Sequence, residues 1–220
     1  MRNKLLAGIG AGMLALTLST SAHAATETLS ENLPVPITVD SSQTVRDFTS
    51  TAAGTVSDVT VMVDFMAHDR GDCALPTSGS FANSGELSIQ LVSPAGTVVY
   101  LVHSWATAQS GQGSYPNYSA APSRVQVIFD DSAATAVGTT DNEAPVTGTF
   151  RPAEPLSAFQ GEDAAGVWRL VFVDAAFLQA KCYYGASLMF ETEVQPAPTP
   201  PTPPAPPAPT PPAKVETAAL

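Results

Sequence analysis

The side chains able to perform nucleophilic or acid–base chemistry are few in this sequence. Only two histidines, His68 and His103, lie beyond residue 24. A nucleophilic serine or cysteine needs a base that a third group orients, and no G-x-S-x-G segment occurs in the chain. His68 stands beside Asp69 and Arg70 in a polar stretch, so we expect it to be a solvated loop residue. The sequence therefore predicts no catalytic residue and no enzyme activity.

Acidic side chains provide a second kind of candidate site. Asp130 and Asp131 are adjacent, and neighbouring strand residues point to opposite faces, so the pair cannot share one acid–base site unless a turn redirects them. Calcium is a better use of such carboxylates, because it accepts roughly six to eight oxygen ligands in a flexible geometry. The candidate calcium ligands are Asp130, Asp174 and Glu86. The alternative is that the acidic excess only keeps the protein in solution, and no EF-hand spacing is present.

Three aromatic residues provide a third kind of candidate site. Trp105, Tyr115 and Tyr118 fall in a long irregular segment, residues 104–123. Connections of this length are uncommon in compact domains unless they are functional or mobile. The rings could form a platform for a carbohydrate or another polymer, or they could cover one end of the domain. The sequence leaves both interpretations open.

The first residues indicate where the chain works. Arg2 and Lys4 precede an apolar run, residues 5–18, which leads to small residues ending at Ala24. The run is shorter than the roughly 20 helical residues that span a bilayer, and the whole pattern is typical of a secretory signal. We predict cleavage between Ala24 and Ala25. The mature protein is then secreted or periplasmic, without a membrane span.

The charge of the chain argues against a nucleic-acid partner. The formal net charge is −11, and removal of residues 1–24 would take away two of the nine basic residues and no acidic one, giving −13. Nucleic acids are bound by clustered Lys and Arg. Here the remaining basic residues are scattered singly along the domain.

Two cysteines, Cys73 and Cys182, are the complete set in the sequence. An exported chain meets an oxidising compartment, in which thiols usually pair. We therefore predict a Cys73–Cys182 disulfide that closes a loop of about 110 residues. In the chain-entropy model, such a loop contributes on the order of 4 to 5 kcal/mol.

The region between the signal and the end of the chain has the pattern of β-strands. Residues 59–64 and 87–92 alternate apolar and polar side chains, the period of two expected of half-buried strands. Similar short runs recur at residues 98–102, 124–129, 167–173 and 186–190. Many short strands between Gly and Pro turns predict an all-β fold, an antiparallel β-sandwich of jelly-roll type.

These features divide the chain into three parts. Residues 1–24 are the predicted signal peptide, and residues 25–193 form the β-sandwich domain. Residues 194–220 form a tail in which proline alternates with alanine and threonine, a composition that favours extended polyproline II and cannot bury a core.

Three segments together resemble the P/Homo B domain of subtilisin-like proprotein convertases. The segments are 87–97, which reads LSIQLVSPAGT; 129–131, which reads FDD; and 148–174, which contains GTFRPAEPLSAFQG followed by GVWRLVFVD. Their order and spacing match the family pattern over most of residues 59–190. The longest of these segments, residues 148–174, places Trp168 on an apolar strand, where we expect it to anchor the core.

The resemblance implies a galactose-binding-like sandwich that accompanies a serine-type endopeptidase and helps the adjacent catalytic domain to fold and remain stable. Members of this family can bind calcium. The chain departs from the family pattern at residues 72–84, which contain Cys73, and at residues 181–188, which contain Cys182. These two departures look like one coordinated variation, in which a disulfide ties an added loop to the last strand pair.

Three functional hypotheses follow. The first is an exported non-catalytic accessory, interaction or stabilising module that binds an unknown protein or a cell-surface polymer. The second is a carbohydrate- or polymer-binding module that uses the loop aromatics. The third is a peptidase-associated fragment or partner, which is linked to proteolysis through a serine protease encoded nearby or in a further region of the chain.

Overall fold

Alternating apolar side chains build the inner faces of two β-sheets. In the computed structural model, which describes residues 23–79, 82–104, 119–120, 122–138 and 145–194, the side chains of Val59, Val61 and Val63 are buried on one sheet, and Leu87 and Ile89 are buried on the other. The sheets pack face to face around one apolar core. The predicted all-β sandwich is therefore confirmed.

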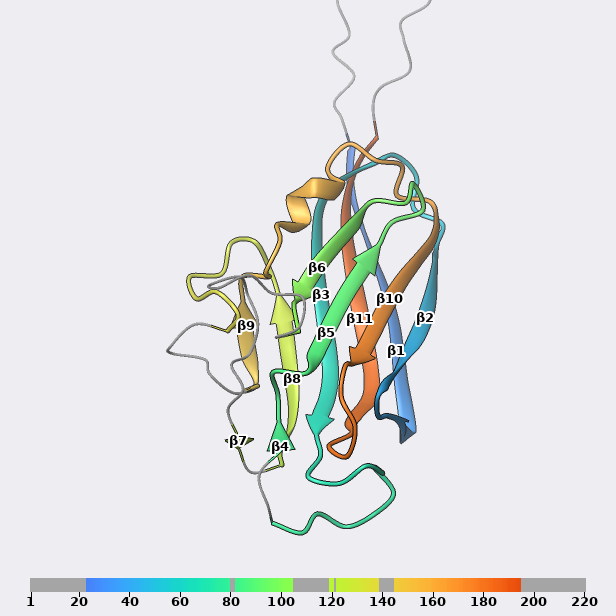
Figure 1. Cartoon of the computed structure of the whole chain (residues 1–220). Coiled ribbons are helices and arrows are strands. Elements are labelled where there is room, and N and C mark those ends of the chain that lie inside the picture. The colour runs from blue at the N-terminus through green and yellow to red at the C-terminus, as the bar shows by residue number, and fades with distance from the viewer. Residues whose placement is uncertain (1–22, 80–81, 105–118, 121, 139–144, 195–220) are drawn as a thin grey trace, which may run out of the picture.

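The strands follow the chain in the order shown in Figure 1. Their bounds are β1 (His23–Val39), β2 (Ser42–Ser50), β3 (Thr55–Ala67), β4 (Ala82–Asn83), β5 (Leu87–Val92), β6 (Val98–Val102), β7 (Ser119–Ala120), β8 (Arg124–Phe129), β9 (Gly148–Phe150), β10 (Gly166–Asp174) and β11 (Lys181–Val194), with a single-turn 3₁₀ helix, η1 (Leu156–Phe159), before β10.

The larger sheet has the strand order β1-β11-β3-β8-β9, and the second sheet has the order β2-β10-β5-β6. Strands β4 and β7 form a separate short pair. Among the strands of the described residues, every pairing is antiparallel except that of β8 with β9, which is parallel. The larger sheet is therefore mixed, a refinement of the wholly antiparallel sandwich expected from the sequence.

Trp168 is the centre of the core, as its apolar strand predicted. The indole is fully buried and donates its Nε1–H to the carbonyl of Ala164 at 3.0 Å. Its ring lies edge-on to Phe159, with centroids 5.1 Å apart, and 4.6 Å from the ring centroid of Phe190. A buried indole needs an acceptor, which the Ala164 carbonyl provides, and the contact with Phe159 packs η1 against the core.

The β5–β6 hairpin also has the predicted turn. Ser93 and Gly96 close it through a hydrogen bond from the Gly96 N–H to the Ser93 carbonyl at 3.0 Å. Gly96 has a φ of 92°, a conformation that glycine adopts without steric cost.

Strand β1 was not expected from the sequence. It pairs with β11, and its inward positions alternate Glu27, Leu29, Glu31 and Leu33. Glu31 accepts hydrogen bonds from the guanidinium of Arg46 on β2, so carboxylates close the open edge between the two sheets. The two glutamates interrupt the apolar alternation, which is why the pattern did not indicate a strand.

The sandwich has two distinct ends. His23 pairs with Val194, so the outermost residues of β1 and β11 lie together at one end, near η1 (Figure 1). We call this the terminal end. The opposite end carries Cys73 and Cys182 and is called the disulfide end. No helix in the described part of the chain is long and apolar enough to cross a membrane.

Candidate functional site

The disulfide end gathers most of the chemically distinctive residues. Cys73 and Cys182 are bonded, with an Sγ–Sγ distance of 2.00 Å and Cα atoms 5.7 Å apart. Cys182 is buried on β11, between Thr38 of β1 and Met66 of β3. The Cys73 N–H donates to Thr38 Oγ1 at 3.2 Å. The loop after β3 is thus fastened to both strands beside it.

A fully buried lysine lies next to this disulfide. Lys181 has no solvent-exposed surface, and its Nζ lies 3.3 Å from Glu86 Oε2 and 3.6 Å from Asp174 Oδ2. The ammonium also donates to the Gln179 carbonyl. Lysine is seldom fully buried unless it is paired, and the two carboxylates provide the pairing here. Two of the three candidate calcium ligands therefore surround a side-chain cation.

The third candidate ligand lies elsewhere. Asp130 follows Phe129, which pairs with Val61, whereas Lys181 pairs with Ala67 six positions further along β3. At about 3.3 Å per residue, the separation along the strand is about 20 Å. Among the residues that the structure describes, no three His, Cys, Asp or Glu side chains cluster closely enough to hold a metal. Asp130, Asp174 and Glu86 therefore do not fit one calcium ion.

Asp130 and Asp131 instead have structural partners. Asp130 Oδ1 accepts the Ser132 N–H at 2.7 Å, which closes a turn after β8. The carboxylate of Asp131 accepts the N–H groups of Leu156 and Ser157 at 2.9 and 2.8 Å, at the start of η1. The turn does redirect the two side chains, but toward separate backbone groups.

Burial changes the acidity of Asp174. Its side chain is almost inaccessible, and this desolvation raises the pKa of Asp174 to about 6, although the ammonium of Lys181 acts in the opposite direction. The nearby carboxylates of Glu86 and Asp40 also raise this pKa. The raised pKa means that burial disfavours the ionised form of Asp174. The surrounding fold therefore holds these charged groups in an electrostatically unfavourable arrangement.

His68 corrects the expectation of a solvated loop residue. Only 1% of its surface is exposed. Its Nδ1 accepts the Arg70 N–H at 3.0 Å, and its Nε2 lies 3.1 Å from the Leu75 carbonyl. Both ring nitrogens are therefore committed to backbone groups. The polar neighbours of His68 in the sequence suggested exposure to solvent. In the structure, the loop that follows β3 covers the ring.

His103 has a different environment near the end of β6. Its ring stacks on that of Tyr100 with centroids 4.2 Å apart, and its Nε2 lies 3.6 Å from Glu154 Oε1. Glu154 also accepts the Tyr100 N–H at 2.9 Å. These contacts position a packed imidazole against a carboxylate.

The turn between β10 and β11 was missed by the sequence interpretation. Phe177 and Leu178 are 70% and 63% exposed, and Leu178 has a φ of 89°. A bulky residue with positive φ is uncommon. Residues 175–180 contain the apolar pair Phe177 and Leu178 but no Gly, Asn or Pro. This apolar pair between two strands is the signal that could have identified the turn.

A polar hollow lies on the outer face of the larger sheet. Asp64, Arg124 and Gln126 line it together with Gly185. Gly185 lies so close to β1 that a Cβ at this position would be 2.2 Å from the Glu31 carbonyl oxygen. Arg124 donates to both oxygens of Asp64 at 2.7 and 2.9 Å, and its guanidinium lies 3.9 Å from the ring centroid of Tyr184. Burial alone would raise the pKa of Asp64, but the hydrogen bonds from Arg124 and Gln126 outweigh burial and lower it.

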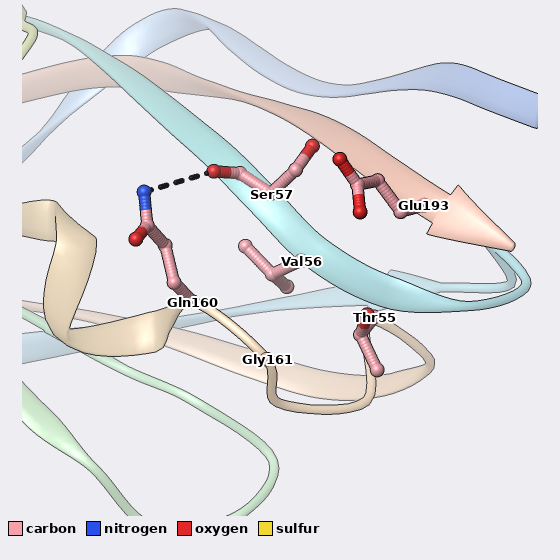
Figure 2. A pocket seen from close by; sticks show the side chains of 6 residues that line it. All are labelled: Thr55, Val56, Ser57, Gln160, Gly161 and Glu193. Carbon is pink, nitrogen blue, oxygen red and sulfur yellow. Dashed lines mark hydrogen bonds between the residues drawn. The ribbon is translucent and has the colours of Figure 1, made fainter. Parts of the chain in front are cut away.

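A second, shallow pocket lies at the terminal end (Figure 2). Ser57 and Glu193 line it together with Gln160, whose Nε2 donates to the Ser57 carbonyl at 3.1 Å. The described residues that line this pocket include one carboxylate, that of Glu193. The hydroxyl, amide and carboxylate groups of the lining can form hydrogen bonds.

Several predicted residues cannot be placed in either region. Trp105, Tyr115 and Tyr118 lie outside the described residues, as do most of the signal segment and the proline-rich tail. Ala24 and Ala25 are described, and both are exposed at the start of β1. The glycan platform and the cleavage site therefore stay predictions.

Comparisons with known proteins place these features in context. The family profile described as the Proprotein convertase P-domain matches residues 56–181. The serine protease of Aeromonas sobria in complex with its chaperone (ORF2) is 20% identical, with a TM-score of 0.44, and the match covers 79% of this chain and 28% of that one. For the structure of the Aeromonas sobria protease alone, the identity is 20%, the TM-score is 0.43, and the coverage is 77% and 27%. The chain thus spans less than a third of those proteins. None of the curated proteins matches it.

Proposed function

This chain belongs to the proprotein convertase P-domain family, and from that premise we propose that it is an exported accessory module, which binds and stabilises a partner protein and catalyses no reaction itself. The P domain is a non-catalytic accessory domain associated with peptidases. The partner is therefore a serine protease carried on another chain or region.

The contacts of His68 support the non-catalytic role for one of the two histidines beyond residue 24. A general base must have a free nitrogen within hydrogen-bond reach of the nucleophile. In His68, one nitrogen accepts a backbone N–H and the other lies on a backbone carbonyl. The His68 ring is therefore a structural element of the disulfide end.

Export is supported by the disulfide and by the sequence of the first 24 residues. A bond between Cys73 and Cys182 requires an oxidising compartment to form and persist. The basic residues and apolar run that precede Ala24 are typical of a signal that directs a chain to such a compartment.

Two measurements on the exported chain, purified from the expressing cell, test this proposal. In the first, casein hydrolysis is followed with and without a serine-protease inhibitor, and we expect no inhibitor-sensitive activity. In the second, the immobilised chain is incubated with culture fluid and periplasmic extract treated with a tagged fluorophosphonate, which labels active serine proteases. We expect a labelled protease to be retained. Inhibitor-sensitive hydrolysis by the purified chain, or retention of no labelled protease, would contradict the proposal.

A further inference from the structure

The β10–β11 turn presents two large apolar side chains to solvent. Phe177 and Leu178 are 70% and 63% exposed, and we call them the apolar tip. Leu75, also exposed, lies in the neighbouring loop at the same end of the sandwich. Single exposed apolar residues are ordinary. Exposed apolar side chains that lie together, unlike scattered ones, mark interaction surfaces.

The backbone of the apolar tip is held in an unfavourable conformation. Leu178 has a φ of 89°, where glycine or asparagine is normally found because a Cβ clashes with the backbone. The Asp40 carboxylate accepts the Leu178 N–H at 2.8 Å. Strain of this kind persists only where the surroundings impose it, and it concentrates at functional sites.

The neighbouring loop and hairpin fix the turn from both sides. The Ser41 N–H donates to the Ala176 carbonyl at 2.8 Å, and the Ala180 N–H donates to the Arg70 carbonyl at 2.9 Å. Gly71 packs against Asp40 so closely that a Cβ on Gly71 would lie 2.8 Å from Asp40 Oδ2. The apolar tip is therefore preorganised, and preorganised anchors lose little conformational entropy on binding.

We propose that Phe177 and Leu178 anchor a protein-docking surface, and that the partner presents an apolar pocket bordered by lysine or arginine. The charge of the partner follows from the carboxylates at this end, Asp40 beside the tip and the exposed Asp72 in the adjoining loop, and from the net charge of −11. Opposite charges across an interface favour association and select the partner. This inference rests on the proposed function, which makes the partner a serine protease.

The charge also disfavours the other occupants of such a surface. A second copy of the chain would bring the same carboxylates against one another. An anionic lipid surface would repel them. The apolar tip also lies opposite the end where His23 and Val194 lie (Figure 1), so a partner bound there does not meet these strand ends.

The test compares retention of the fluorophosphonate-labelled protease by four forms of the exported chain: the wild type, Phe177→Ser, Leu178→Gly and the control Val98→Ser. Val98 is an exposed apolar residue of β6 beside the β5–β6 turn, at the opposite end. We expect each tip variant to weaken retention at least about tenfold, the loss typical of an anchor residue, and Val98→Ser to leave it unchanged. The melting temperature of Leu178→Gly should equal or exceed that of the wild type, because glycine tolerates the positive φ.

Each remaining outcome overturns the inference. Equal retention of the protease by wild type and Phe177→Ser would show that the apolar tip is not part of the interface, while leaving the proposed function intact. Retention that does not change with added salt would contradict the proposed lysine or arginine residues around the partner's pocket. A dimer in sedimentation, or binding to phosphatidylglycerol vesicles, that Phe177→Ser abolishes would assign the tip to a second copy or to lipid. Retention of no protease by the wild type would overturn the proposed function as well.

Discussion

The two ends of the sandwich hold their charged groups in opposite ways. At the disulfide end, Lys181 and Asp174 are buried, and desolvation raises the pKa of Asp174 to about 6. At the terminal end, Glu27 on β1 accepts hydrogen bonds from the end of β2. Burial alone would raise its pKa, but the hydrogen bonds from Ser50, Thr51 and Ala52 lower it. The fold therefore disfavours the ionised form of Asp174 at the disulfide end and favours the ionised form of Glu27 at the terminal end. The unfavourable buried charges lie beside the Cys73–Cys182 disulfide, which holds that end together.

The largest expected effect comes from breaking the disulfide. Cys73→Ala removes the bond and leaves the buried Cys182 in place, so little core volume is lost. We expect the free energy of unfolding, measured by urea denaturation, to fall by about 4 kcal/mol. Chemical reduction of the wild type should give the same value. A change below about 1 kcal/mol would show that the disulfide end holds together without its bond.

An effect of similar size is expected from removing the buried ammonium of Lys181. Lys181→Met leaves Glu86 and Asp174 facing one another without a cation. Removing one partner of a buried charge pair typically costs about 3 to 5 kcal/mol. The loss should be greater at about pH 8 than at about pH 5, because Asp174 can take up a proton at the lower pH.

The matched control for this variant is the triple substitution Lys181→Met, Glu86→Gln and Asp174→Asn, which removes all three charges together. We expect its unfolding free energy to exceed that of Lys181→Met at about pH 8. Urea denaturation at both pH values checks this order. Equal stability of the single and triple variants would show that the carboxylates do not repel one another.

The two ends should respond to pH with opposite signs. The raised pKa of Asp174 means that its contribution to stability is full below its ordinary value and is lost as the pH rises from about 4 to about 6. The unfolding free energy of wild type relative to Asp174→Asn should fall over this range by up to about 3 kcal/mol, at about 1.36 kcal/mol per pKa unit.

Glu27 provides the opposing measurement. Because its pKa is lowered in the fold, its stabilisation is present above the ordinary glutamate value and is lost as the pH falls through the folded value. The unfolding free energy of wild type relative to Glu27→Gln should therefore rise with pH in the acid range, by less than the Asp174 effect. If both differences changed in the same direction, the contrast between the two ends would be wrong.

Local chemistry explains which parts of the fold could be predicted. The β5–β6 hairpin follows from proline and glycine at Pro94 and Gly96, and Trp168 follows from its apolar strand. The disulfide follows from there being two cysteines in a chain that the sequence predicts to be exported. In each case the necessary information lies within a few residues or in the composition.

The remaining features depend on contacts between distant segments. Lys181 can be buried because two carboxylates of the other sheet pair with it: Glu86, which precedes β5, and Asp174, which ends β10. Strand β1 escaped prediction because Glu27 and Glu31 face inward at the sandwich edge. Residue type alone made Glu86 and Asp174 look like calcium ligands. Their partners appear only when the strand order is known.

We propose that this P domain stabilises a serine protease without acting as one. The most direct measurement is the rate at which the retained protease loses casein-hydrolysing activity on heating, with and without the purified chain. We predict slower inactivation in the presence of the wild-type chain and of Val98→Ser, and a smaller effect with Phe177→Ser. Equal inactivation rates with and without the wild-type chain would contradict the claim.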